Sequence, residues 1–215
     1  MKTAFIFDFD GTIGETIPLV FEAAEAAYAS VGLSAPSRAE MRAHFGPCEL
    51  GFFRSLTPEC GDGLFRKYLE FYGLLHDKFS PAPFEGIPET VKLLVQKGAK
   101  VGIVTGKSKN TAEISLSKYG IAPLFSPIEC GSPKGAIKPE KIAAVLSAWK
   151  TTPAETKTYY VGDAVGDVSD AEIAGIIPLS AAWSKLADIA ELKKTRARKI
   201  FESVSDFRDW ADAAF

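Results

Sequence analysis

Closely spaced acidic residues behind apolar runs are the features of this sequence best suited to chemistry. Asp8 and Asp10 follow an apolar run near the N-terminus, and Asp163 and Asp167 follow another far along the chain. Carboxylates held close together repel one another, and a divalent cation between them relieves that repulsion. Magnesium prefers oxygen ligands of this kind. If the two runs are neighbouring strands, the acids predict a magnesium site.

Groups suited to an anion follow other parts of the chain. Thr105 and Gly106 end a third apolar run, and Lys138 precedes a proline at the expected start of a helix. A hydroxyl, an ammonium group and glycine amides can all hold phosphate oxygens. Ligands of open parallel sheets bind beyond the carboxyl ends of the strands. Acids and anion-binding groups at that edge predict phosphoryl transfer, in which positioning and charge neutralisation provide most of the catalysis.

The elements that must position these residues alternate along the chain. Short apolar runs typical of buried strands occupy 4–9, 100–105, 158–161 and 177–182. Segments with helical spacing separate the later runs, at 89–98, 111–120 and 139–149, with glycine or proline at their ends. This alternation predicts an α/β protein with a Rossmann-like, doubly wound parallel sheet.

One segment interrupts the alternation. From about residue 15 to residue 79 the spacing of apolar residues is helical throughout, with a possible capping box formed by Ser37 and Glu40. A proline-containing stretch, 80–83, then forms an expected stiff hinge. We therefore expect an α/β core domain built from residues 1–14 and 81–215, and an inserted all-helical domain over residues 15–80.

Composition excludes several classes of function. The 215 residues carry a net charge of -2, which gives no footprint for nucleic acid, and we expect the basic cluster 193–199 on a surface helix. No stretch is apolar enough to span a membrane and no secretory signal is present, so a cytoplasmic protein is expected. The three cysteines fit neither a disulfide framework nor a zinc site.

The motifs occur in the order known from one superfamily. Residues 8–12, Asp-Phe-Asp-Gly-Thr, resemble the nucleophile loop of the haloacid dehalogenase superfamily. Residues 104–108 resemble its second motif, Lys138-Pro139 its third, and 161–175 its fourth. The helical insert after the first motif is similar to the C1 cap of the phosphoglycolate phosphatase and β-phosphoglucomutase branch. The resemblance covers nearly the whole chain.

The resemblance implies a role for each matched residue. Asp8 would be the nucleophile that forms an aspartyl phosphate, and Asp10 the acid/base. Thr105 and Lys138 would hold the phosphate. The backbone of the matched loops would add substrate contacts at Gly11, Thr12 and Gly106, and Mg²⁺ would be bound by Asp8, Asp10, Asp163 and Asp167.

Several alternatives stay open at this stage. The motifs fit a phosphatase for a small phosphorylated metabolite, of the phosphoglycolate or sugar-phosphate type, and equally a phosphomutase. A non-catalytic phospho-acceptor regulator is a third hypothesis, because receiver domains also combine acidic strand ends with a Thr and a Lys. Arg42, His44 and Arg54 flank the Gly46-Pro47 break, whose loop could reach the substrate, but surface positions are expected for them. Neither a monomer nor a homodimer is excluded.

Overall fold

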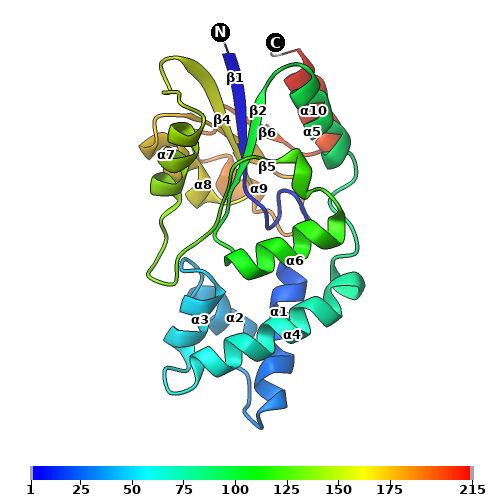
Figure 1. Ribbon diagram of the computed structural model, residues 1–215, viewed down its shortest axis with the longest axis vertical. Coiled ribbons are helices and arrows are strands. Elements are labelled where there is room, and N and C mark those ends of the chain that lie inside the picture. Colours follow the sequence, from blue (N-terminus) through cyan, green and yellow to red (C-terminus); the bar gives the residue numbers. More distant parts are fainter. Residues whose placement is uncertain (1, 214–215) are drawn as a thin grey trace.

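The computed structural model describes residues 2–213, and a six-stranded sheet forms its centre (Figure 1). The strand order is β3-β2-β1-β4-β5-β6, and every neighbouring pair is parallel. The strands are β1 (Lys2–Phe7), β2 (Lys100–Val104), β3 (Ile128–Glu129), β4 (Thr156–Gly162), β5 (Ile177–Ala181) and β6 (Lys199–Phe201). The expected α/β, doubly wound parallel fold is confirmed.

Alternating residues of β1 supply two separate hydrophobic cores. Phe5 and Phe7 pack on one face of the sheet with α5 (Ile87–Gln96) and α10 (Val204–Asp212). Ala4 and Ile6 pack on the other face with α7 (Lys138–Ala148) and α8 (Val165–Ile173). A strand covered on both faces has no polar side to show, which explains its continuous apolar run. Figure 1 shows the two helical layers on either side of the sheet.

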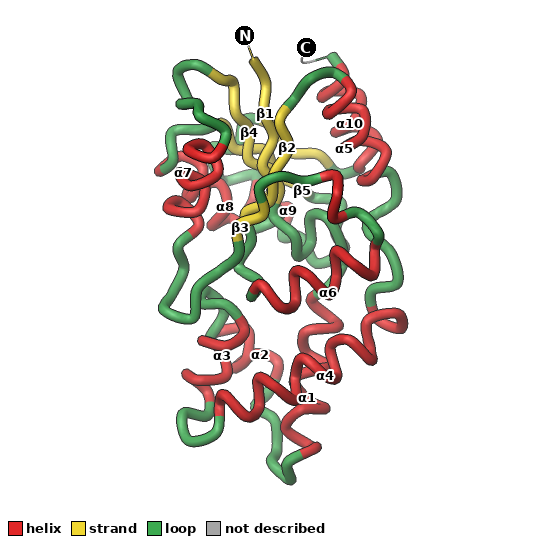
Figure 2. The backbone as a smooth tube through the Cα atoms, viewed as in Figure 1, coloured by secondary structure: helices red, strands yellow, loops and turns green. Residues whose placement is uncertain are grey.

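The segment expected to be inserted contains helices only. They are α1 (Ile17–Ser30), α2 (Arg38–Ala43), α3 (Glu49–Leu56) and α4 (Gly61–Phe79), and they lie together beyond one end of the sheet (Figure 2). Their buried aromatic and aliphatic side chains form a hydrophobic cluster of their own. The predicted capping box at the start of α2 is confirmed, since Ser37 and Glu40 exchange hydrogen bonds. We call residues 15–80 the helical insert.

The remaining elements connect the strands. They are α6 (Lys109–Tyr119), a 3-10 turn (Ala122–Leu124) and α9 (Ile189–Leu192). The expected helix over the basic cluster 193–199 is wrong: α9 ends at Leu192, a turn follows, and Lys199 begins β6. Residue 1 and residues 214–215 of the expected core range lie outside the described part of the chain. Within residues 2–213, no helix combines the length and apolarity needed to cross a membrane.

Candidate active site

Asp8 is the first residue beyond β1, and its neighbours hold it at the edge of the sheet. Its backbone N–H donates to the carbonyl of Val161 on β4, at 2.9 Å. The side chain is buried, with Oδ2 accepting from Lys138 Nζ at 2.8 Å. Oδ1 is also buried and has no hydrogen-bond partner among the described residues. A carboxylate oxygen buried without a partner is costly, so this atom calls for a ligand.

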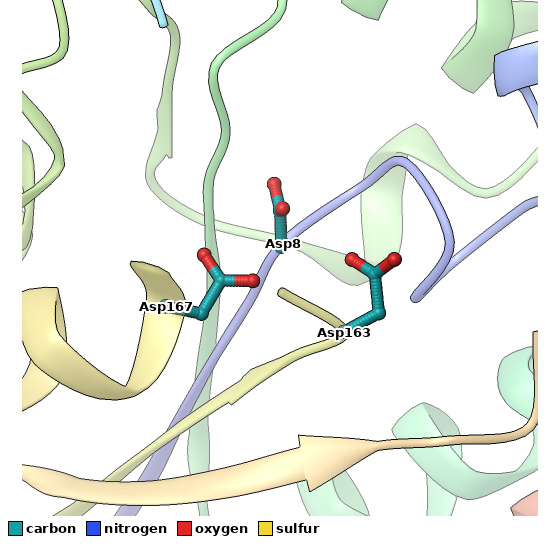
Figure 3. A group of neighbouring side chains, drawn as sticks. All are labelled: Asp8, Asp163 and Asp167. Carbon is teal, nitrogen blue, oxygen red and sulfur yellow. The ribbon is translucent and has the colours of Figure 1, made fainter. Parts of the chain in front are cut away.

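Three carboxylates converge at this point. One ligand oxygen each from Asp8, Asp163 and Asp167 lies within 4.8 Å of the others. Figure 3 shows the three side chains next to one another, extending in much the same direction. Asp163 follows β4 directly. Asp167 sits in the first turn of α8, where its Oδ2 also accepts from the N–H of Ala164 at 3.0 Å and so caps the helix.

The backbone of two glycines makes room for these acids. A Cβ on Gly11 would come 2.1 Å from Asp163 Oδ2, and one on Gly162 would come 2.3 Å from Asp167 Oδ2. Gly11 also has a φ of +70°, which L-residues rarely adopt. The glycine of the Asp-Gly-Thr stretch therefore packs under Asp163 and fixes the space available to that carboxylate.

The electrostatics of the cluster favour a cation. Burial, together with the charges of neighbouring acids, raises the pKa of Asp163 from an ordinary 3.8 to about 8. Burial likewise raises the pKa of Asp8 to about 6, although Lys138 opposes the shift. Each shift reports that a bare negative charge is disfavoured there. The all-oxygen donor set and the orphaned Asp8 Oδ1 fit a hard divalent ion such as Mg²⁺.

Lys138 opens α7 and faces the same cluster. Its Nζ lies 2.8 Å from Asp8 Oδ2 and 2.5 Å from Asp167 Oδ1. Burial disfavours its charged form, but the carboxylates of Asp167 and Asp8 hold the pKa of Lys138 well above its ordinary range. Lys134, the other lysine of this loop, is exposed. A permanent positive charge therefore stands beside Asp8, where it can hold an anion.

Asp10 lines the site as well, and its hydrogen-bond partners come from the start of the helical insert and from the second motif. Its Oδ1 accepts from the hydroxyl of Thr16 and from Lys107 Nζ at 2.9 Å. Both donors bind the same oxygen, so Oδ2 is left without a partner among the described residues. Asp10 also lines the cavity that lies between the sheet edge and the helical insert.

A cavity of about 460 Å³ lies between the sheet edge and the helical insert. The sheet edge contributes Asp8, Asp10, Thr105, Gly106, Lys138, Asp163 and Asp167 to its walls. Gly11 and Thr12 do not line it: the Thr12 side chain is fully buried and its carbonyl accepts from Trp183 Nε1. All the predicted site residues except these two thus line one cavity. Thr105 does so from the position directly after β2.

The helical insert also lines the cavity, with residues that the sequence analysis does not predict as site residues. Arg42, Glu49, Phe52 and Tyr68 line the cavity together with the Gly46-Pro47 loop. That loop does reach over the sheet edge, and Arg42 faces the cavity with it. His44 bonds to Ser55 and Arg54 pairs with Asp62, so neither joins the site. Most aromatic side chains of the insert form its hydrophobic core, and Phe52 and Tyr68 belong to that core and also line the cavity.

Fold and site together define a class of protein, and the comparison with known families agrees. A model of the haloacid dehalogenase-like hydrolase family matches residues 5–180. The chain therefore belongs to the haloacid dehalogenase-like hydrolases, which confirms the family expected from its motifs.

Individual relatives cover most of the chain. The pyrophosphatase PpaX of Bacillus pumilus is 29% identical over 203 residues, covering 94% of this chain and 92% of the relative. The phosphoglycolate phosphatase of Xylella fastidiosa is 29% identical over 185 residues, covering 83% and 79%. Among solved structures, one described as a predicted phosphatase from Clostridium acetobutylicum superposes with a TM-score of 0.78 at 17% identity, covering 98% of both chains. The last likeness concerns the fold alone.

Proposed function

We propose that this protein is a magnesium-dependent phosphatase that hydrolyses a small phosphorylated metabolite through an aspartyl phosphate on Asp8. The supporting observation is that Asp8, Lys138 and the acid cluster meet in one cavity, which Asp10 also lines. The names of the relatives, pyrophosphatase and phosphoglycolate phosphatase, agree with this chemistry.

The proposed reaction gives each of these side chains a role. A carboxylate oxygen of Asp8 attacks the phosphorus, and the bond between phosphorus and the leaving oxygen breaks. Asp10, through Oδ2, gives a proton to that oxygen and then takes one from the water that attacks the phosphorus of the acyl phosphate. Phosphate leaves and the Asp8 carboxylate is restored. The Thr105 hydroxyl and the Lys138 ammonium hold the phosphoryl oxygens throughout.

Asp8, Asp163 and Asp167 would hold the Mg²⁺, with the backbone carbonyl of Asp10 as a further proposed ligand. When bound, the ion offsets the negative charge of the phosphoryl group and of the clustered acids. As parts of the same proposal, the helical insert closes the site against bulk water, the location is cytoplasmic, and the protein is a monomer or homodimer.

A metabolite panel tests the proposal. With Mg²⁺, the protein should release phosphate from p-nitrophenyl phosphate and from at least one compact substrate among phosphoglycolate, pyrophosphate and sugar phosphates. Asp8→Asn should release none, while Asp209→Asn, which removes an exposed acid on α10, should match the native protein. Turnover by Asp8→Asn, or no turnover with any compound, would contradict the proposal. A sugar-phosphate isomer formed without free phosphate would identify a phosphomutase instead.

A further inference from the structure

A buried lysine that the reaction does not use links Asp10 to the helical insert. The Lys107 side chain is fully inaccessible, and its Nζ lies 2.9 Å from Asp10 Oδ1 and 3.7 Å from Glu49 Oε1. Aromatic rings of Phe9 and Tyr72 lie 5.8 and 5.0 Å from the ammonium group. A buried ammonium must be paired, and breaking such a pair from one side is costly. Asp10 and Glu49 are the acids that pair it.

Glu49 is the part of this network that the helical insert brings to the core. It is the first residue of α3, and its carboxylate accepts from the N–H of Ser108 at 2.5 Å and from the hydroxyl of Thr111 at 2.6 Å. Both donors belong to the first turn of α6 or its cap, on the core side. A carboxylate at a helix N-terminus is well placed both for hydrogen bonding and for the helix dipole.

The backbone around Glu49 is seated on the core as well. The N–H of Cys48 donates to the carbonyl of Ser132 at 2.9 Å, and Gly51 packs so closely on Pro133 that a Cβ would come 2.5 Å from its carbonyl oxygen. Moving α3 away from the sheet edge would break these contacts together with those of Glu49. Asp10 would then be the one acid still paired with Lys107 among the described residues.

We propose that Glu49 is a positioning residue: seated on the first turn of α6, it fixes Lys107, which orients Asp10 for proton transfer while α3 lies on the core. The inference rests on the proposed function, since it assigns a supporting residue to the acid/base of that reaction. Lys107 and Thr16 both donate to Asp10 Oδ1, so in this proposal Oδ2 is the oxygen left for proton transfer. Glu49 holds the Lys107 ammonium group in the position from which it donates to Asp10 Oδ1.

The two half-reactions offer a test that separates positioning from general damage. p-Nitrophenolate leaves without a proton, so phosphorylation of Asp8 by p-nitrophenyl phosphate needs little from Asp10, whereas hydrolysis of the aspartyl phosphate needs it as a base. Rapid mixing with p-nitrophenyl phosphate and Mg²⁺ resolves a burst of nitrophenolate from the steady state. The variants are Glu49→Ala, which removes the carboxylate, and Glu49→Gln, which keeps one acceptor oxygen.

Asp77→Asn is the matched control. Asp77 also joins the insert to the core, through Lys118 on α6 at 2.8 Å, but has no contact with Lys107 or Asp10. We expect Glu49→Ala to slow steady-state turnover about tenfold or more while the burst rate changes less than about threefold, with Glu49→Gln between it and the native protein. With an alkyl phosphate, whose leaving group needs a proton, the first step should slow too. Asp77→Asn should show none of this.

Two outcomes would overturn the inference. One is steady-state turnover by Glu49→Ala within about threefold of the native rate. The other is an equal loss of burst and steady-state rates, which would point to a disturbed Asp8 or phosphate pocket. Thermal unfolding of both variants accompanies the kinetics to establish that they are folded. Failure of the proposed function appears differently, as a native protein without magnesium-dependent phosphate release or an active Asp8→Asn.

Discussion

Lys138 Nζ lies 2.8 Å from Asp8 Oδ2, although 130 residues separate the two in the chain. The pair gives the proposed nucleophile a fixed positive neighbour before any substrate arrives. It also offsets part of the repulsion between Asp8 and the other acids of the cluster, since Nζ lies 2.5 Å from Asp167 as well. Removal of this ammonium therefore affects catalysis and the acid cluster together.

Lys138→Met should lower kcat/KM by about 100-fold or more, because a preorganised charge at the phosphoryl group is lost. The variant should also gain more in melting temperature from Mg²⁺ than the native protein does, since the acids lose their internal counter-charge. Phosphate release and thermal unfolding measure the two effects. Lys134→Met, an exposed change in the same loop, is the control. If the two variants had the same kcat/KM and the same gain in melting temperature from Mg²⁺, Lys138 would not be part of the active site.

Without metal, stability should fall as the pH rises. The pKa values of Asp8 and Asp163 rise on folding from 3.8 to about 6 and about 8. The folded state therefore binds more protons than the unfolded state in this range, so the stabilising contribution is complete below pH 3.8 and is lost as the pH rises through the folded pKa values. A cation replaces those protons.

The gain in melting temperature on adding Mg²⁺ to EDTA-treated protein should accordingly be larger at pH 8 than at pH 6. Differential scanning calorimetry with and without the ion at each pH isolates the effect from other titrations. Asp163→Asn should flatten the dependence. A gain that is independent of pH, or that shrinks as the pH rises, would contradict the assignment of these acids as ligands.

Gly11→Ala should impair the site by displacing Asp163, because the new Cβ would come 2.1 Å from Oδ2. Gly32→Ala is a closely matched control: its φ of +75° carries a similar backbone strain, of about 1 kcal/mol, but its Cβ would meet nothing within 4 Å. Urea unfolding should show the backbone strain in both variants, with a further loss of stability in Gly11→Ala from the clash with Asp163. Only Gly11→Ala should lose activity, by about 100-fold, since small displacements of reacting groups are costly. Equal activities would contradict this account.

His76 should make stability depend on pH in the opposite sense to the metal-site acids. It is fully buried at the end of α4, where Nε2 contacts the Ser115 hydroxyl at 2.9 Å and Nδ1 has no partner among the described residues. Burial lowers the pKa of His76 from 6.5, with Lys107 and Lys118 adding to the shift and Asp77 opposing it. A proton added at Nδ1 would have no acceptor.

The contribution of neutral His76 is therefore complete above pH 6.5 and is lost as the pH falls through its lower folded pKa. Urea unfolding at pH 7.5 and about 5.5 should show a drop in the native protein that His76→Leu reduces. The Leu variant loses the bond to Ser115 at both pH values, so the difference between them is the informative quantity. An unchanged difference would exclude His76 as the source.

Local patterns in the sequence predicted the central strands and crossover helices, because a strand buried on both faces is apolar throughout. They failed at the sheet edges. The two residues of β3 and the three of β6 are too few to show any periodicity. The charges of 193–199 resemble a helix surface, although this segment contains a turn and the start of β6. Element bounds also moved by up to two residues at most ends, as at β1, which begins at Lys2 and ends at Phe7.

The catalytic motifs were predictable because topology brings the ends of parallel strands to one edge. Lys107 and Glu49 were not singled out, since their significance depends on a contact between the insert and the core. Lys107 follows Thr105 and Gly106 in the sequence, and a lysine so close to a strand end is a signal that could have marked it as a site residue. Glu49 offered none, because 59 residues separate it from the amide of Ser108 that it binds.

The place of β1 inside the sheet has a consequence for motion. This strand is paired along both edges, to β2 and β4, whereas the helical insert keeps a separate hydrophobic cluster. Opening motions follow such boundaries between cooperative units. Amide protons of β1 should therefore exchange with deuterium far more slowly than those of α1–α4. Asp8 therefore follows a strand that resists local opening. The opening motions that admit and release small molecules would be those of helices α1–α4, which face it.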